Sequence, residues 1–202
     1  GAIGSASSWT TTNIASINSN AKGFRGAVFD GRYVYFIPLL NGAYNGLWVR
    51  YDTQGSFSAP GSYQFYDLTT FNASAVGFYG GIFDGKYIYL MPYYNGANYH
   101  GQFVRFDTTG SFTSAGSYSI YNLTNLNANA RGYFGATFDG RYLYLSPFYN
   151  DITYSGLVVR YDTTQSFTSA GSYYTYDMTG ISGSYVGFLG TNHHAGKLVM
   201  AT

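Results

Sequence analysis

Phe29-Asp30-Gly31-Arg32-Tyr33-Val34-Tyr35 decides how this chain folds, because nearly the same seven residues occur three times. The stretch returns 54 residues later from Phe83 and another 55 residues later from Phe138. A second signature of Val, Arg, an aromatic residue, Asp and Thr begins, at intervals of 55 residues, at Val49, Val104 and Val159. A period of this length is typical of arrays and propellers built from one repeated supersecondary unit.

Each repeat predicts four short antiparallel strands and no helix. Asp-Gly between two apolar runs is a strong signal for a tight hairpin, because the turn needs positive φ angles. In the second repeat the strands are expected at 77–83, 86–91, 102–107 and 118–123. Four-stranded antiparallel units in series are the pattern of β-propeller blades, so the predicted fold is an all-β propeller.

The two ends of the chain carry fragments of a further repeat. Residues 8–14 align with the fourth strand at 62–68. Residues 187–190 align with 23–26 and, after one inserted residue, 196–200 align with 31–35, which supplies a first and a second strand. We therefore expect a single domain over 1–202, with repeats at 15–68, 69–123 and 124–178 and a closing blade from 179–202 plus 8–14.

Two ways of closing the ring follow from these fragments. The N-terminal strand can complete the last blade of its own chain, which gives a four-bladed monomer without exposed sheet edges. Alternatively, the N-terminal strands of one copy join the C-terminal strands of another, and a homodimer shares a larger ring. The sequence favours the closed monomer.

Over residues 8–202, these signatures resemble the kelch-type repeats of bacterial β-propellers, and most closely uncharacterised bacterial repeat proteins with the same two signatures. Kelch repeats place a pair of glycines after the second strand, whereas this chain has Pro38, Pro92 and Pro147 there. The resemblance implies a propeller fold and a binding or scaffolding role, and it carries over no catalytic residues.

The composition excludes several classes of function. Only 9% of the residues are charged and the net charge is +1, which argues against nucleic acid and acidic membrane surfaces as partners. No apolar run is long enough to span a membrane, so no membrane insertion is expected. The absence of Cys excludes disulfides and thiol chemistry. Of the possible locations, an extracellular or cell-surface one is favoured.

Most charged residues recur at one position of the repeat, as expected of structural groups. Eight of the nine acids, all of which are Asp, and nine of the ten bases are phased in this way, which leaves Asp151 and Arg25. The Asp of each Asp-Gly pair is expected to bind its own turn backbone. Arg50 and Asp52 lie on one face of a strand, where they can pair with a neighbouring blade or with backbone groups. No pair of acids stands out as a glycosidase centre.

Other phased residues are also expected to be structural. Near the propeller axis, small residues permit close approach of the backbone. The glycines in this phase are Gly26, Gly80, Gly135 and Gly190. Tyrosines of the second strand are expected to fill the space between blades. These are Tyr33, Tyr35, Tyr87, Tyr89, Tyr142 and Tyr144.

His193 and His194 are the strongest candidates for metal ligation, but adjacent strand residues point to opposite faces. Ala195 also replaces the turn Asp of the other repeats. We therefore expect neither a metal nor another cofactor, and no enzymatic activity. A metal-dependent hydrolase or lyase with its site near these histidines is the weakest alternative.

The loops after the second and fourth strands emerge on the same side and gather uncharged polar and aromatic residues. The predicted ligand-binding residues are Asn41, Tyr44, Tyr94, Asn95, Tyr99, Tyr149, Asn150 and Tyr154 after the second strands, and Asn18, Asn72 and Asn127 after the fourth. Aromatic rings stack on sugars while amides bind hydroxyl groups. The prediction is a non-catalytic module that binds carbohydrate or another neutral polar ligand, with a glycan or another protein as partner. The alternatives are a structural or assembly domain without a small ligand and, for each single residue, an ordinary role in a turn.

Overall fold

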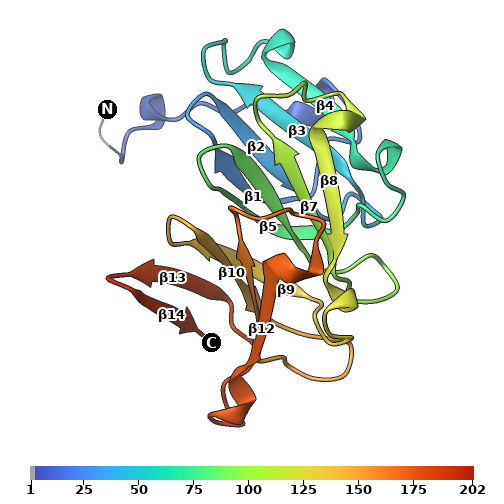
Figure 1. The fold of residues 1–202 in the computed structure, drawn as a ribbon. Helices are drawn as coiled ribbons and strands as arrows, with labels where there is room; N and C mark the ends of the chain where they lie inside the picture. The colour runs from blue at the N-terminus through green and yellow to red at the C-terminus, as the bar shows by residue number, and fades with distance from the viewer. Residues whose placement is uncertain (1–2) are drawn as a thin grey trace.

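The computed structural model describes residues 3–202, which fold into three four-stranded antiparallel sheets and a C-terminal hairpin (Figure 1). The helices of these residues are single 3-10 turns of three residues each. The all-β prediction is therefore confirmed, and the strands of the second repeat begin and end within one residue of their expected positions.

The elements repeat in the same order along the chain. The first sheet contains β1 (Phe24–Phe29), β2 (Tyr33–Pro38), β3 (Leu47–Asp52) and β4 (Tyr63–Asp67). The second contains β5 (Phe78–Phe83), β6 (Tyr87–Pro92), β7 (Gln102–Asp107) and β8 (Tyr118–Asn122). The third contains β9 (Tyr133–Phe138), β10 (Tyr142–Pro147), β11 (Leu157–Asp162) and β12 (Tyr173–Asp177). The hairpin consists of β13 (Gly190–His194) and β14 (Lys197–Ala201).

Short 3-10 turns flank each fourth strand. Those before it are η3 (Pro60–Ser62), η5 (Ala115–Ser117) and η7 (Ala170–Ser172). Those after it are η4 (Leu68–Thr70), η6 (Leu123–Asn125) and η8 (Met178–Gly180). The N-terminal segment contains the corresponding pair, η1 (Ala6–Ser8) and η2 (Ile14–Ser16).

The sheets are arranged side by side through their first strands, in the order β1, β5, β9, β13. The hydrophobic core lies between the sheets. One cluster, with Tyr35, Trp48 and Phe106, joins the first sheet to the second, and another, with Phe103 and Tyr161, joins the second to the third. Each sheet is thus stabilised by its neighbours.

The Asp-Gly turns are held by their own carboxylates, as expected. Asp84 Oδ1 accepts hydrogen bonds from the backbone N–H groups of Lys86 (2.8 Å) and Tyr87 (2.7 Å). Its Oδ2 accepts the Tyr89 hydroxyl at 2.7 Å. Burial, and next this hydrogen bond, raise the pKa of Tyr89. Asp30 and Asp139 repeat the arrangement, so this Asp phase is structural.

The phased arginines connect neighbouring sheets through aromatic rings. The Arg50 guanidinium lies 4.0 Å from the centre of the Tyr33 ring and 4.7 Å from that of Phe112, which is in the loop between β7 and β8 of the second sheet. Asp52 instead pairs with Arg32 of its own sheet at 2.7 Å. Arg50 therefore contacts the neighbouring sheet, whereas Asp52 forms its ion pair within its own sheet.

The prediction about close-packed glycines needs correction. A Cβ atom on Gly80 would lie 2.5 Å from the Phe134 carbonyl oxygen, but one on Gly26, Gly135 or Gly190 would meet open space. The tight positions come three residues earlier, where the chain enters each first strand beneath the loop after the second strand. These are Gly23, Gly77 and Gly132, which have positive φ and would place a Cβ against the carbonyl oxygens of Leu40, Tyr94 and Tyr149.

The expected closure of the last blade by residues 8–14 is not observed. Residues 9–13 form no strand, and they pair with neither β13 nor β14. Within residues 3–202, β13 and β14 have no third strand beside them to which a fourth strand could be added. The N-terminal segment instead packs Ile14 and Ile17 against the cluster around Val49 and Tyr63.

The C-terminal hairpin differs by one residue from the alignment. Ala195 and Gly196 form its two-residue turn with φ of 49° and 74°, the positive values that such a turn requires. Thr191 therefore pairs with Met200, as Gly81 pairs with Leu90. Met200 thus takes the place of Leu90 rather than that of the tyrosine before it.

A methyl group on Gly77 tests the interlock between loop and first strand. We expect Gly77→Ala to lower the free energy of unfolding by at least about 2 kcal/mol, because φ is +70° and the Cβ would overlap the Tyr94 carbonyl oxygen. Gly61→Ala is the control, since its Cβ would meet nothing within 4 Å. Urea denaturation of the two variants measures the difference, and equal stability would contradict the interlock.

Candidate functional site

The loops after the second strands lie next to one another on one side of the sheets. Each closes on itself through an isolated β-bridge, Leu40 to Tyr44, Tyr94 to Tyr99 and Tyr149 to Tyr154. Each is also bonded to the segment that enters the next sheet. The N–H of Gly77 donates to the Asn45 carbonyl (3.0 Å), and that of Gly132 to the His100 carbonyl (3.2 Å). The loops are therefore positioned by the same glycines that join the sheets.

The predicted tyrosines form a continuous row across these loops, which we call the tyrosine row. Successive ring centroids are 5.0 Å apart from Tyr44 to Tyr94, 5.0 Å from Tyr94 to Tyr99, 5.1 Å from Tyr99 to Tyr149 and 5.5 Å from Tyr149 to Tyr154. Tyr154 is 54% exposed, and the other four are partly buried. The structure thus brings all five predicted tyrosines together.

The predicted asparagines are largely engaged in turns. The side-chain oxygens of Asn18, Asn72 and Asn127 each accept the backbone N–H two residues further on. Asn95 and Asn150 each accept two backbone N–H groups of their own loop, and Asn41 donates to the Asn20 carbonyl. Asn150 is also buried. Of these six residues, Asn95 is exposed, which leaves its amide the most accessible to a ligand.

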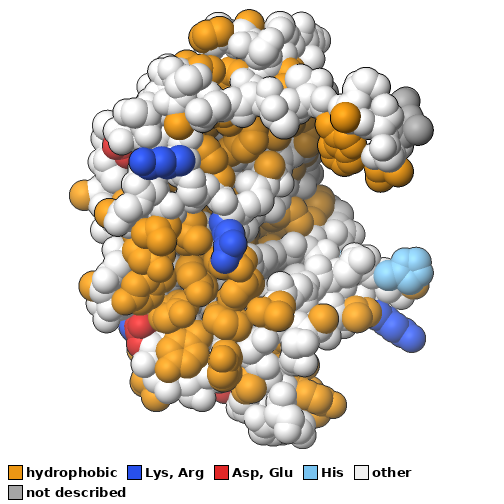
Figure 2. Space-filling view, turned by 180° about the vertical axis from the view of Figure 1, so that it is seen from behind, with side chains coloured by type: hydrophobic (Ala, Val, Ile, Leu, Met, Phe, Trp, Pro, Cys, Tyr) orange, Lys and Arg blue, Asp and Glu red, His pale blue; other side chains and the backbone are white. Residues whose placement is uncertain are grey.

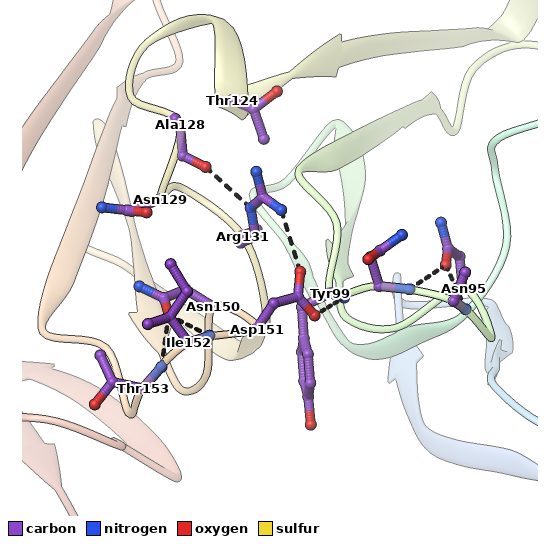
Figure 3. A network of polar contacts seen from close by, with 12 residues as sticks. Asn95, Tyr99, Thr124, Ala128, Asn129, Arg131, Asn150, Asp151, Ile152 and Thr153 are labelled. Atoms are coloured by element: carbon purple, nitrogen blue, oxygen red, sulfur yellow. Dashed lines mark hydrogen bonds and ion pairs between the residues drawn. The ribbon is translucent and has the colours of Figure 1, made fainter.

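Asp151, the acid outside the repeat pattern, connects two loops (Figure 3). Its Oδ1 accepts the backbone N–H of Tyr99 at 2.8 Å, and its Oδ2 pairs with Arg131 at 3.1 Å. The other repeats have glycine at this position, and Asp151 keeps a positive φ of 75°. An unusual backbone conformation is thus maintained by a bridge that neutralises the carboxylate and links the second loop to the third.

His100 is buried beneath the same loops and holds the strand that follows. Its Nδ1 accepts the Gln102 N–H at 3.2 Å, while Nε2 lies 3.2 Å from the Gly77 carbonyl oxygen, which requires a proton on Nε2. Burial lowers the pKa of His100 to about 4. The imidazole is neutral near pH 7 and acts as a turn-capping group, as Asn45 does in the first repeat.

Two further places were not predicted as sites. A cavity of about 320 Å³ lies among the first strands, where the unphased Arg25 stacks on Tyr79 at 5.1 Å. A larger groove lies between the third sheet and the last hairpin. Among the described residues, β13 and β14 form a two-stranded sheet, whereas the other three sheets each have four strands.

The histidine pair lies at the end of β13, where His193 is half-buried and His194 is exposed. Within residues 3–202, no three His, Cys, Asp or Glu side chains are grouped so that they could hold a metal ion.

No protein-family model matches the chain, and no curated protein is similar to it. Across the described residues, no helix has the length and hydropathy needed to cross a membrane.

The buried imidazole predicts a specific pH dependence. In the unfolded chain His100 has a pKa near 6.5, whereas in the folded protein it binds a proton only near pH 4. The free energy of unfolding therefore falls as the pH drops from 6.5 to 4, by up to about 3 kcal/mol. The shifted carboxylates Asp52, Asp107, Asp139 and Asp162 titrate below this window.

His100→Asn is the matched variant, because Asn45 already accepts the equivalent N–H in the first repeat at 3.0 Å. We expect its stability, measured by urea denaturation at several pH values, to change little between pH 6.5 and 4.5. A slope equal to that of the wild type would refute this role of His100.

Proposed function

We propose that this protein is a non-catalytic binding module for carbohydrate or another neutral polar ligand, bound on the loop side of the sheets. The observation that carries the proposal is the tyrosine row, which runs across loops from all three sheets with ring centroids 5.0 to 5.5 Å apart. A row of this kind is long enough to contact several units of a polymer rather than one small molecule.

The chemistry of the row supports a neutral ligand. Tyrosine rings offer apolar faces to the C–H groups of a sugar, and their hydroxyl groups exchange hydrogen bonds with it. Asn95 and Asn98 add exposed amides beside Tyr94 and Tyr99. The nearby carboxylate of Asp151 is paired with Arg131, so the loops carry little net charge.

We also propose that the three sheets are blades of a β-propeller of the kelch-like kind. Their consecutive antiparallel strands and the adjacency of β1, β5, β9 and β13 support this assignment. In this geometry the tyrosine row lies on one rim of the propeller, where loops vary without disturbing the sheets.

A role in assembly is the second candidate function. It is favoured by one observation, the apolar groove left beside the last hairpin, whose counterparts between complete sheets are filled by aromatic side chains.

A glycan array followed by titration calorimetry tests the binding proposal. We expect the wild type to bind a neutral glycan and Tyr154→Ala to weaken that binding by about fivefold, since an aromatic stacking contact is worth about 1 kcal/mol. Tyr154 suits the test because it is half exposed. Phe29→Ala is the control, since Phe29 is also 54% exposed but lies at the other end of its sheet, next to the Asp-Gly turn. A folded wild type that binds nothing in either assay would refute the proposal.

A further inference from the structure

The groove at the end of the third sheet has a volume of about 750 Å³ and is lined mainly by apolar atoms. The third sheet contributes Tyr144, Val158, Arg160 and Tyr176, and the hairpin contributes Leu198 and Met200. Tyr176 is 48% exposed. The groove is therefore the outer half of an interface between sheets, left uncovered.

The chain itself shows what fills this position elsewhere. Between the first and second sheets, Tyr66 stacks on Tyr118 with ring centroids 4.9 Å apart and planes at 15°. Between the second and third sheets, Tyr121 stacks on Tyr173 at 4.6 Å and 9°. Tyr176 occupies the position in the third repeat that Tyr66 and Tyr121 occupy in the first and second. The side chain that fits the groove beside Tyr176 is therefore an aromatic residue at the start of a fourth strand.

The contacts of Arg160 in the third sheet also indicate that a neighbouring group is missing at this groove. The Arg105 guanidinium lies 4.2 Å from the ring centre of Tyr87 and 4.7 Å from that of Phe167, which is in the loop between β11 and β12 of the following sheet. Arg160 lies 4.5 Å from Tyr142, but its second ring is Tyr174 of its own sheet, at 5.4 Å. The contact across to the next sheet is missing among the described residues.

The N-terminal segment already has the local conformation of a fourth strand. Trp9 follows η1 with φ −115° and ψ 137°, and Tyr63, Tyr118 and Tyr173 follow η3, η5 and η7 with φ from −112° to −117° and ψ from 139° to 149°. Asn13 caps η2 by accepting the Ala15 N–H, as Asp67 caps η4. Both ends of this segment are formed, although no sheet includes it.

Trp9 occupies the phase of the tyrosines that stack on Tyr66 and Tyr121, and it is 65% exposed. The groove of the same chain lies on the other side of an open gap from Trp9. Figure 1 shows the N-terminal segment and the β13–β14 hairpin projecting on the same side without meeting, and Figure 2 shows the hollow between them. Ile14 and Ile17 anchor the segment on the first sheet, and the Thr12 hydroxyl interacts with Tyr63.

We propose that the groove of one copy binds the Trp9 segment of a second copy. In this contact Trp9 stacks on Tyr176 of the other chain, in the place that a tyrosine of the fourth strand takes between complete sheets. Each copy offers one segment and one groove, so two reciprocal contacts close a symmetric dimer with no unfilled groove. This inference concerns a different surface from the tyrosine row and does not rest on glycan binding.

Sedimentation equilibrium over a range of concentrations tests the proposal. We expect a dimer for the wild type, and a dissociation constant raised about thirtyfold or more for both Trp9→Ala and Tyr176→Ala, since buried aromatic residues dominate such interfaces. Ile152→Ala is the control, because Ile152 is 78% exposed and is not among the residues that line the groove. Unchanged circular dichroism confirms that each variant is folded.

Mixing the two variants distinguishes this dimer from other associations. In the mixture, Trp9 of the Tyr176→Ala chain meets the unaltered groove of the Trp9→Ala chain, so heterodimers are expected where each variant alone is monomeric. The chain has two tryptophans, of which Trp48 is fully buried. Acrylamide quenching of the exposed Trp9 should therefore decrease as the wild type associates. A wild type that stays monomeric, including one in which Trp9 is protected at every concentration because its own chain closes on it, overturns the proposal.

Discussion

The structure depends on the packing of each sheet's aromatic side chains against the sheet before it. Phe106 and Tyr118 of the second sheet, with Phe112 of the loop between β7 and β8, surround Tyr35 and Trp48 of the first, with ring centroids between 5.4 and 6.0 Å apart for the contacting pairs. A four-stranded sheet cannot bury both of its faces alone, so one repeat is stable only when it packs against another. The same kind of interface recurs between each pair of adjacent sheets, and it requires many aromatic and few charged side chains.

Much of the fold could be predicted because the repeat presents its local rules three times. The Asp-Gly turns and the strand boundaries follow from patterns within a few residues, and the structure confirms both. The glycine prediction was less successful, because it assumed that crowding occurs within the first strand. Within the strand only Gly80 of the predicted glycines is crowded, whereas the position that is tight in all three sheets is the entry to the strand, as where Gly77 meets the Tyr94 carbonyl. That contact joins residues of separate loops, and no local pattern identifies it.

The ends of the chain were harder to predict for a related reason. Alignment with the other repeats identifies β13 and β14, but the two-residue turn at Ala195 and Gly196 shifts their pairing by one residue and changes which side chains face the third sheet. Residues 8–14 carry the pattern of a fourth strand, yet a strand exists only where a neighbour offers hydrogen bonds. For the candidate site, the sequence located the tyrosines, whereas the bridge from Asp151 to Tyr99 and Arg131 depends on how the loops meet.

Because every interface joins only adjacent sheets, the molecule behaves as a short one-dimensional array whose stability is a sum over neighbours. The middle sheet, β5 to β8, is packed on both faces, whereas in the part of the chain that the structure describes each terminal sheet has one outer face that no complete sheet covers. Thermal opening of such an array begins at its ends and reaches the middle sheet last. The backbone amides of the second sheet are therefore the slowest to exchange with solvent, and anything that covers an end slows exchange there first.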